Sequence, residues 1–483
     1  MTLPSPIDLE KWFEVNIEDF FVLVPTSVSP QPVHVLNGFF HGVFSGRRSP
    51  RTAIDFVATR SGGGWAVSNQ DLRQRSPLGL PRDDLKLDKA RRAVASLIAA
   101  DRAVYSGFAS FQIAYPGLIT SDSTHLRIGE LSARLTFLDS KGAPLLQRLL
   151  ERLKEPQPNP HWAIEKVLSE PGVLDDVVVE PPSQIAWWGL DPAYSQLAAN
   201  LSQMQVRALR LAVESRDSLL GLEVLAISAT WMALLVYSQL PSLQIDGRLA
   251  PLLVEADAPG ALPSVRARSA EVISLLDARF QEFLVKKLLL DLQERFPGGV
   301  ASGPSAIQYL VECNNTVKKL SGGTVMSPEA IQEVYGIWSH DHSPDKAMAR
   351  TLQDCITSAM GNKSRDWFAA VGRHCGFVGP RRGHPTRLRV EVSLVPALVL
   401  AGIEDTDGLT VPYNIWADRL AEKFGLIFGP HAVARQMINR AAENELEANQ
   451  KALEDLLTSL GLARRYSDGV TEILNPFFSW VNA

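Results

Sequence analysis

The hydrophobic pattern of the chain is dominated by residues 224–245, VLAISATWMALLVYSQLPSLQI, which run for 22 residues without a charge. The first 14 are almost wholly apolar, whereas the end of the segment contains serine, glutamine and proline. A membrane-spanning helix needs about 20 predominantly apolar residues, and a shorter run is more typical of a helix in a protein core. Because Glu223 and Asp246 flank the segment and no basic cluster sets an orientation in a bilayer, we expect a central buried helix and no membrane contact.

Further helices are predicted around this segment. Residues 194–215 are amphipathic, and residues 265–296 carry apolar side chains at helical i, i+3, i+4 spacing until a Pro-Gly-Gly sequence ends the pattern. Residues 85–104 and 143–154 show the same kind of spacing. The chain is therefore expected to be mainly α, with a helical middle domain.

Two Ser-Pro pairs predict helix starts in the second half of the chain. They are Ser327-Pro328 and Ser343-Pro344. Serine can cap free N–H groups, and proline suits the first helical position. Gly361 is expected to end the second of these helices.

Extended structure is predicted in the N-terminal region. Residues 20–25 (FFVLVP) are typical of a buried strand, and residues 33–44 suggest extended chain around a turn at Asn37-Gly38. Residues 108–115 alternate enough to form another strand. Three prolines within residues 155–160 favour a linker. We therefore predict a mixed α/β N-terminal region that ends near residue 155.

The C-terminal residues have the element order of a winged helix. The expected elements are helices at residues 412–424, 431–439 and 443–460, a short strand at 426–428, and a β-hairpin at 462–473. The hairpin would turn at Asp468-Gly469, a dipeptide that suits the positive φ of a tight turn. Gly461 is the expected left-handed residue after the last helix.

These patterns suggest a multidomain chain. At 483 residues, roughly three domains of about 150 residues each is the default expectation. We divide the chain into a mixed α/β domain at residues 1–155, a helical core domain at 161–300, a helical domain with a basic loop at 301–403, and a winged-helix-like module at 404–483.

Composition is that of an ordinary globular protein with a net charge of −5. The cysteines Cys313, Cys355 and Cys375 form no CxxC pair, so a reducing cytoplasm is expected, and the charged N-terminus does not read as a secretory signal. The triplet at residues 62–64 is all glycine but lacks the Lys-Ser or Lys-Thr of a phosphate-binding loop. No cofactor is expected.

Two clusters could carry chemistry. His340-Asp341-His342 has side chains that can bind a metal and activate water, although a solvated loop before a helix is the simpler interpretation. His374-Cys375 could pair a base with a nucleophile, but sequence neighbours usually point apart, and a packed cysteine is favoured. No catalytic or metal-binding residue is assigned, and the chain is expected to have no catalysis of its own.

Arginines provide the clearer signal for binding. Five occur between residues 367 and 390 with no acidic residue: Arg373, Arg381, Arg382, Arg387 and Arg389. Arginine grips phosphates and carboxylates through its planar fork, so this stretch could contact nucleic acid or an acidic protein; a solvated loop is the alternative. A second basic area, at residues 40–110, has 12 Lys and Arg against 6 Asp and Glu.

The winged-helix-like module has its own basic residues but is acidic as a whole. Arg464 and Arg465 lie on the predicted wing, and Arg435 and Arg440 on a helix. Residues 404–483 nevertheless contain 7 Lys and Arg against 12 Asp and Glu. Because attraction to phosphates dominates DNA affinity, this module is expected to bind protein rather than DNA.

Three stretches carry a family resemblance: CGFVGPRRG (375–383), VPYNIWADRLAEKFGLIFG (411–429) and LGLARRYSDGVTEILNPF (460–477). They resemble the C-terminal half of uncharacterised accessory proteins encoded in bacterial anti-phage operons, of the kind associated with DNA-modification-based defence. The resemblance implies a scaffold subunit that works beside ATPases, methyltransferases or nucleases. These are fold-type motifs, so they transfer no active-site residue.

Taken together, these features predict a cytoplasmic, non-catalytic interaction subunit of a bacterial anti-phage defence complex. Its expected partners are other protein subunits, with DNA contacts through the arginine loops. The alternatives are a metal-dependent nuclease built on His340, Asp341 and His342, and a winged-helix DNA-binding regulator.

Overall fold

The computed structural model describes residues 4–23, 25, 30–45, 55–57, 59, 64–75, 80–98, 124–155, 177–182, 192–256, 262–300, 302–317, 323–361, 363–380, 385–430 and 441–479. The described chain is mostly helical, with small sheets of two or three strands. The expectation of a mainly α protein is confirmed.

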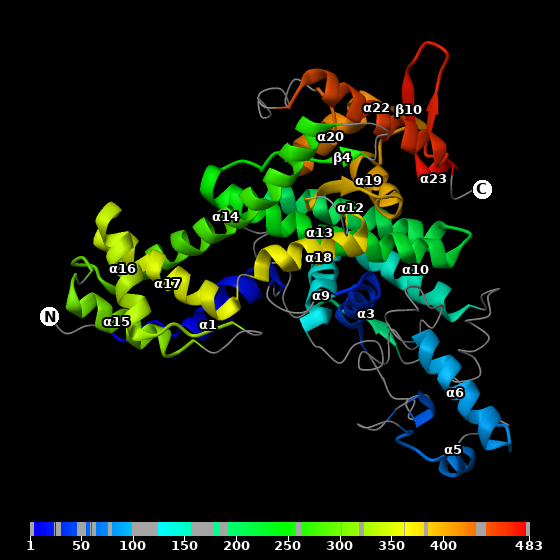
Figure 1. Ribbon diagram of the computed structural model, residues 1–483. Coiled ribbons are helices and arrows are strands. Elements are labelled where there is room, and N and C mark those ends of the chain that lie inside the picture. The colour runs from blue at the N-terminus through cyan, green and yellow to red at the C-terminus, as the bar shows by residue number, and fades with distance from the viewer. Residues whose placement is uncertain are drawn as a thin grey trace.

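The central helix is α13 (Ser218–Asp246), which crosses the middle of the molecule (Figure 1). The Asp217 side chain caps it by accepting hydrogen bonds from the N–H groups of Leu219 and Leu220, and Gly247 ends it at φ 66°. Among the described residues, α13 is the one helix long and apolar enough to cross a membrane, and 83% of its most apolar window is buried inside the protein. The prediction of a buried core helix is confirmed.

Other long helices cover α13. The main neighbours are α12 (Ser195–Glu214), α14 (Pro263–Arg295), α3 (Pro32–Val43), α9 (Thr124–Thr136) and α18 (Lys363–Cys375). Tyr237 of α13 stacks on Phe280 of α14 with ring centroids 5.1 Å apart, and it meets Trp367 of α18 at 5.6 Å. Most buried apolar side chains thus join one continuous core.

The N-terminal region differs from the prediction. It contains α1 (Leu9–Phe13), a π-helix (Glu14–Glu18) and α2 (Asp19–Phe21) before α3, so the predicted strand at residues 20–25 and the predicted turn within residues 33–44 are wrong. Nearly all of α3 is buried. A helix that is almost wholly buried has few polar residues, here His34, Asn37 and His41, and its largely apolar sequence resembles that of a buried strand.

Glycines at the crossing of α3 and α9 explain the Asn37-Gly38 dipeptide. A Cβ atom on Gly129 of α9 would lie 2.2 Å from the backbone nitrogen of Phe39, and one on Gly42 would lie 2.6 Å from Cβ of Ala133. The small residues therefore let two helices approach closely instead of making a turn. Strand β1 (Phe44–Ser45) follows α3 and pairs with β2 (Val178–Val179); the strand predicted at residues 108–115 lies outside the described residues.

The Ser-Pro helix starts are confirmed. Helix α16 (Pro328–Asp341) begins after Ser327, whose hydroxyl accepts a hydrogen bond from the N–H of Ala330 at 3.2 Å. Helix α17 (Pro344–Met360) begins after Ser343 and ends at Gly361, where φ is 66°. Helix α15 (Pro304–Asn314) packs against α16 and α17, whereas α10 (Gly142–Lys154) packs against α12.

Short strands join segments that are far apart in sequence. Strand β3 (Leu252–Leu253) pairs in parallel with β8 (Leu426–Ile427). Strand β4 (Glu255–Ala256) pairs in parallel with β6 (Arg387–Val390), which also pairs with β5 (Val378–Gly379). These pairs cross the boundaries expected near residues 300 and 403, and the division into four domains stays a prediction.

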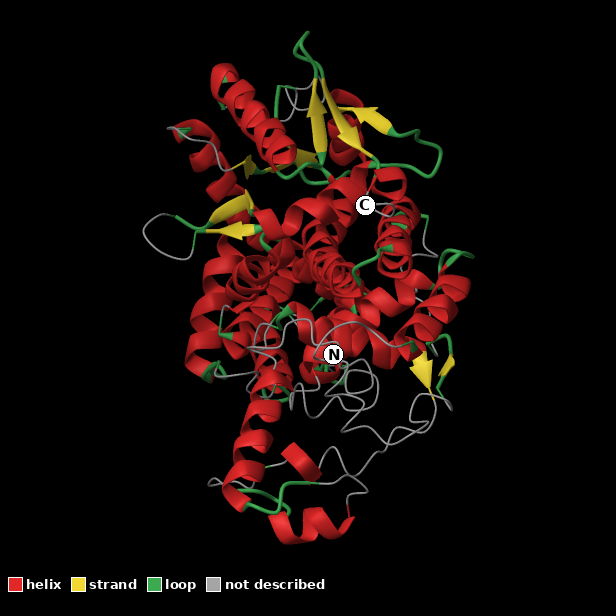
Figure 2. Cartoon of the chain, turned by 90° about the vertical axis from the view of Figure 1, so that its right-hand side faces the viewer, coloured by secondary structure: helices red, strands yellow, loops and turns green. Residues whose placement is uncertain are grey.

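The C-terminal segment builds a three-stranded antiparallel sheet in the order β7-β10-β9 (Figure 2). Its elements are α19 (Val395–Gly402), β7 (Thr410–Pro412), α20 (Tyr413–Phe424), α22 (Glu443–Ser459), β9 (Ala463–Arg465), β10 (Thr471–Leu474) and α23 (Pro476–Ser479). Gly461 is left-handed at φ 69°, and Gly469 lies in the hairpin turn at φ 85°. The predicted helix 443–460 and hairpin are confirmed; the helix predicted at 431–439 lies outside the described residues.

Candidate functional site

The arginines predicted at residues 373–389 do not form one exposed group. Arg387 is 5% exposed and makes an ion pair with the buried carboxylate of Glu255, which also pairs with Arg266 at 2.6 Å. Arg373 on α18 is half-buried and donates a hydrogen bond to the Thr386 hydroxyl at 3.1 Å. Arg387 therefore neutralises an internal carboxylate and is not part of the surface.

Two further arginines of this stretch, Arg381 and Arg382, lie outside the described residues. Arg389 is half-buried on β6, next to Arg387. Binding of a partner by this basic stretch stays a prediction.

The β9–β10 hairpin is the most prominent projection of the C-terminal sheet, and it extends away from the helical body (Figure 1). Its register pairs Ala463 with Ile473 and Arg464 with Glu472. The turn closes because the N–H of Tyr466 donates to the carbonyl of Val470 at 2.9 Å and the N–H of Gly469 donates to the carbonyl of Tyr466 at 3.0 Å. A short connection with a glycine at positive φ holds these strands in one register.

The tip of the hairpin exposes apolar side chains. Tyr466 and Val470 face each other across the turn and are each 47% exposed. The Tyr466 hydroxyl donates a hydrogen bond to the Glu472 carboxylate at 3.1 Å, an interaction that raises the pKa of the tyrosine. Arg464 is exposed on β9, opposite Glu472 of β10. Exposed tyrosine and arginine beside an aliphatic side chain are typical of protein-binding surfaces.

The base of the hairpin is fixed to α22. Arg465 forms ion pairs with Asp455 at 2.6 Å and with Glu454 at 3.4 Å. The Thr471 hydroxyl also donates to Glu454, at 2.8 Å. Hydrogen bonding to Asp455 and the two nearby carboxylates raise the pKa of Arg465. Of the two predicted wing arginines, Arg465 therefore orients the hairpin, and Arg464 is presented to solvent.

The histidine and cysteine candidates do not assemble into a reactive site. His342 stacks on Trp338 with ring centroids 5.7 Å apart, and no group of three or more His, Cys, Asp or Glu in the described part of the chain could hold a metal ion. Cys375 is fully buried, and burial raises the pKa of its thiol to about 12. His374 Nδ1 lies 3.0 Å from the carbonyl oxygen of Pro30.

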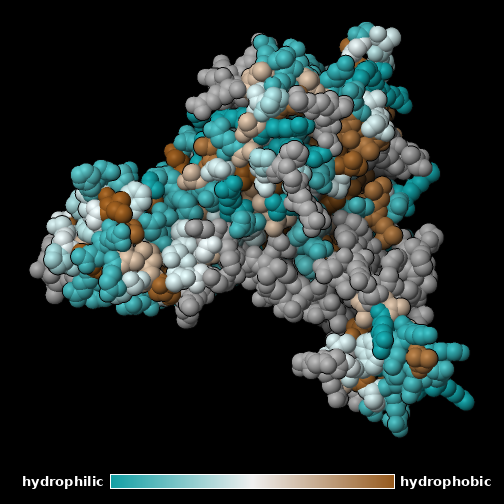
Figure 3. All heavy atoms as spheres, in the orientation of Figure 1, coloured by the Kyte–Doolittle hydropathy of each residue, from teal (hydrophilic) through white to brown (hydrophobic). Residues whose placement is uncertain are grey.

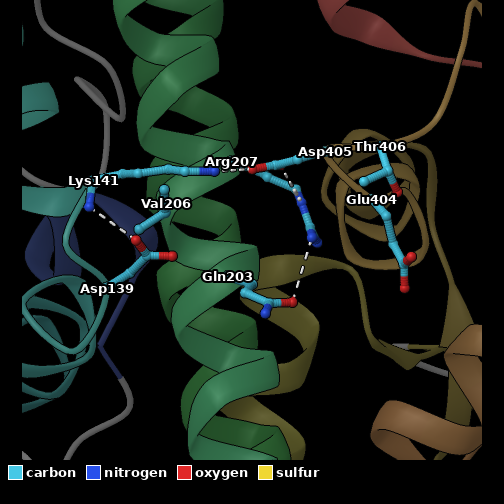
Figure 4. A pocket seen from close by; sticks show the side chains of 8 residues that line it. All are labelled: Asp139, Lys141, Gln203, Val206, Arg207, Glu404, Asp405 and Thr406. Carbon is cyan, nitrogen blue, oxygen red and sulfur yellow. Dashed lines mark hydrogen bonds and ion pairs between the residues drawn. The ribbon is translucent and has the colours of Figure 1, made fainter.

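A charged pocket of about 270 Å³ lies where α12 meets two loops (Figure 4). It is lined by Asp139, Lys141, Gln203, Val206, Arg207, Glu404, Asp405 and Thr406. Arg207 comes from α12, and its guanidinium points towards Asp405 and Gln203. Lys141 forms an ion pair with Asp405 from the other side. The pocket thus brings together three distant segments through one carboxylate.

Charges around this pocket balance one another. Burial lowers the pKa of Arg207, and the charge of Asp405 opposes that effect. Burial acts to raise the pKa of Asp405, but the hydrogen bond from Lys141 and the charge of Arg207 together bring it below its usual value. Next to it, Lys423 binds Glu404 at 2.7 Å. The pocket is therefore an ion-pair latch between segments, with no excess charge of one sign.

Sequence reasoning missed both the apolar hairpin tip and this latch. The signal for the tip was present, since Tyr466 and Val470 flank the predicted Asp468-Gly469 turn. The latch gave no local signal because Lys141, Arg207 and Asp405 are far apart along the chain.

Comparisons with protein-family models, with curated proteins and with solved structures found no match to this chain.

Proposed function

We propose that this chain is a non-catalytic interaction subunit that binds a protein partner through the β9–β10 hairpin. The observation that carries the proposal is the projecting hairpin tip, with Tyr466 and Val470 exposed beside Arg464. Burying two such side chains against a partner would remove apolar surface from water, and an arginine beside them adds directional hydrogen bonds.

The element order supports a winged-helix-like role for this module. Helices α20 and α22 precede the hairpin, and β7 completes its sheet. A wing that serves DNA needs a positive surface, whereas residues 404–483 carry 12 acidic against 7 basic residues. A protein partner fits this charge better than DNA. Together with the resemblance of residues 375–477, this favours an accessory subunit of a cytoplasmic bacterial anti-phage defence complex.

Co-purification with defined partners tests the proposal. The tagged full-length chain would be co-expressed with each protein encoded beside it in its genome. A stable complex is expected with at least one of them, and Tyr466→Glu with Val470→Glu should abolish it because two charges then enter an apolar interface.

A matched control is available on α16. Ile337 is 60% exposed on α16, and this helix lies at the opposite side of the molecule from the hairpin in Figure 1. Ile337→Glu should leave the complex intact. Loss of the complex in this control, or an unchanged complex in the hairpin variant, would contradict the proposal.

A further inference from the structure

The described residues between 55 and 98 (55–57, 59, 64–75 and 80–98) form a small unit with a core of its own. Helices α5 (Asn69–Arg75) and α6 (Asp84–Ile98) lie at the edge of the molecule in both ribbon views (Figures 1 and 2). The buried apolar side chains of this unit lie outside the continuous main core: Phe56, Val57, Leu72, Leu87 and Val94.

Arg91 holds this unit together. Its side chain is fully buried and donates hydrogen bonds to the backbone carbonyls of Asp55, Phe56 and Val67 at 2.8–3.0 Å. It also donates to the Asn69 side chain at 2.8 Å, and its guanidinium lies 4.1 Å from the centre of the Trp65 ring. A buried guanidinium that satisfies this many groups fixes the orientation of α6.

The opposite face of α6 is cationic. Lys86, Lys89 and Arg92 are all exposed and follow one another at intervals of three residues, so they share one side of the helix. Leu87 and Arg91 face the interior. The three cations span about 9 Å along the helix axis at about 1.5 Å per residue. Figure 3 shows hydrophilic side chains projecting from this corner of the molecule.

The neighbouring carboxylates have contacts within the unit, and the charge of one of them, Asp88, also interacts with Arg92 of the cationic face. Asp84 forms an ion pair with Arg73 at 2.5 Å. Asp88 accepts hydrogen bonds from Trp65 and Asn69, both at 2.8 Å. Asp83 accepts from the N–H groups at the start of α6. Residues 82–92 hold five Lys and Arg against three Asp, so this part of the unit carries an excess of positive charge.

We propose that the α6 face formed by Lys86, Lys89 and Arg92 binds the phosphate backbone of double-stranded DNA. Successive phosphates on one strand of a duplex are about 3.4 Å apart along the DNA axis. Three cations that span about 9 Å along the helix axis can therefore reach neighbouring phosphates at one edge of a groove. An acidic protein would need apolar anchors, and among the α6 side chains that the structure describes, this side offers only the exposed Leu85. This binding site is separate from the hairpin and does not depend on it.

Fluorescence anisotropy of the full chain with a labelled random-sequence duplex tests this site. Binding is expected at 50 mM salt. The variant Lys86→Gln, Lys89→Gln, Arg92→Gln should bind more weakly, and the slope of log K against log salt should be smaller in magnitude by about 2.7, since each phosphate contact contributes about 0.9. Between 50 and 200 mM salt, the wild-type chain should therefore lose about 40-fold more affinity than the variant.

The control changes the same number of exposed cations elsewhere: Arg248→Gln, Arg365→Gln and Lys451→Gln. This control variant should keep the wild-type affinity and salt slope, because DNA binding is expected to depend on the α6 face and not on the net charge of the chain. Absence of wild-type binding at 50 mM salt, an equal loss in the control, or an unchanged α6 variant would overturn the proposal. Binding of polyglutamate as tightly as duplex would also overturn it, in favour of an acidic protein partner.

Discussion

At the scale of single residues, the central helix depends on apolar side chains that have no access to water. Trp231, Leu234 and Val236 of α13 are fully buried. A charge placed among them has no partner and is poorly solvated, so its burial destabilises the folded state strongly.

Leu234→Asp is therefore expected to lower the free energy of unfolding by about 4 kcal/mol or more and to prevent folding of most of the protein. Circular dichroism with thermal unfolding measures this. The control is Leu220→Asp on the same helix, because Leu220 is 47% exposed and an acidic residue near a helix N-terminus is tolerated. Equal stability of the two variants would show that α13 is not a core helix.

At the scale of elements, glycine decides how closely α3 and α9 pack. Gly129 faces the backbone of α3, where its missing side chain leaves no room for a methyl group. Gly336 of α16 is also helical but has open space around its Cβ position. The same substitution should thus have opposite effects at the two sites.

Gly129→Ala is expected to lower the free energy of unfolding by about 1–3 kcal/mol, because the helices must move apart. Gly336→Ala should raise it by up to about 1 kcal/mol through better helix propensity. Urea unfolding of both variants measures the two effects. A neutral Gly129→Ala would contradict the close crossing of α3 and α9.

Elements with local signals were predictable from sequence. The Ser327-Pro328 start, the Gly361 end and the hairpin at Asp468-Gly469 each depend on a few adjacent residues. The α3 helix was not recognised because nearly all of its residues are buried and most are apolar, and because Asn37-Gly38 was interpreted as a turn, although His34, Asn37 and His41 recur at helical spacing.

Pairings between distant segments could not be predicted. Strands β3 and β8 have two residues each. They pair because the helices that precede them, α13 and α20, end close to each other in the folded chain. Contacts between distant residues of the candidate sites were equally unpredictable from the sequence. The hairpin tip could be located from its turn, but the internal ion pair of Arg387 with Glu255 could not.

At the scale of the whole molecule, the Lys141–Asp405–Arg207 latch connects the N-terminal helices, α12 and the C-terminal module. The lowered pKa of Asp405 means that its stabilising effect is present above the unfolded-state value near 3.8 and is lost as pH falls through the lower folded value. Acid should therefore weaken the attachment of these segments.

Asp405→Asn is expected to be less stable than the wild-type chain at pH 6, and this difference should shrink as pH falls below 3.8. Because Asp405 is partly exposed, solvent screening keeps the effect below about 1 kcal/mol. Urea unfolding at a series of pH values measures it, with the exposed Glu333→Gln of α16 as a control for general acid effects. A difference that stays unchanged as pH falls further below 3.8 would exclude the latch as its cause.

Hydrogen–deuterium exchange of the full chain, alone and bound to the partner found by co-expression, shows directly which segments the partner covers. We predict that protection on binding is greatest in residues 460–474, which contain the β9–β10 hairpin, and absent from α16. Protection confined to other segments, with an unchanged hairpin, would contradict the proposal that this chain binds its partner through the hairpin.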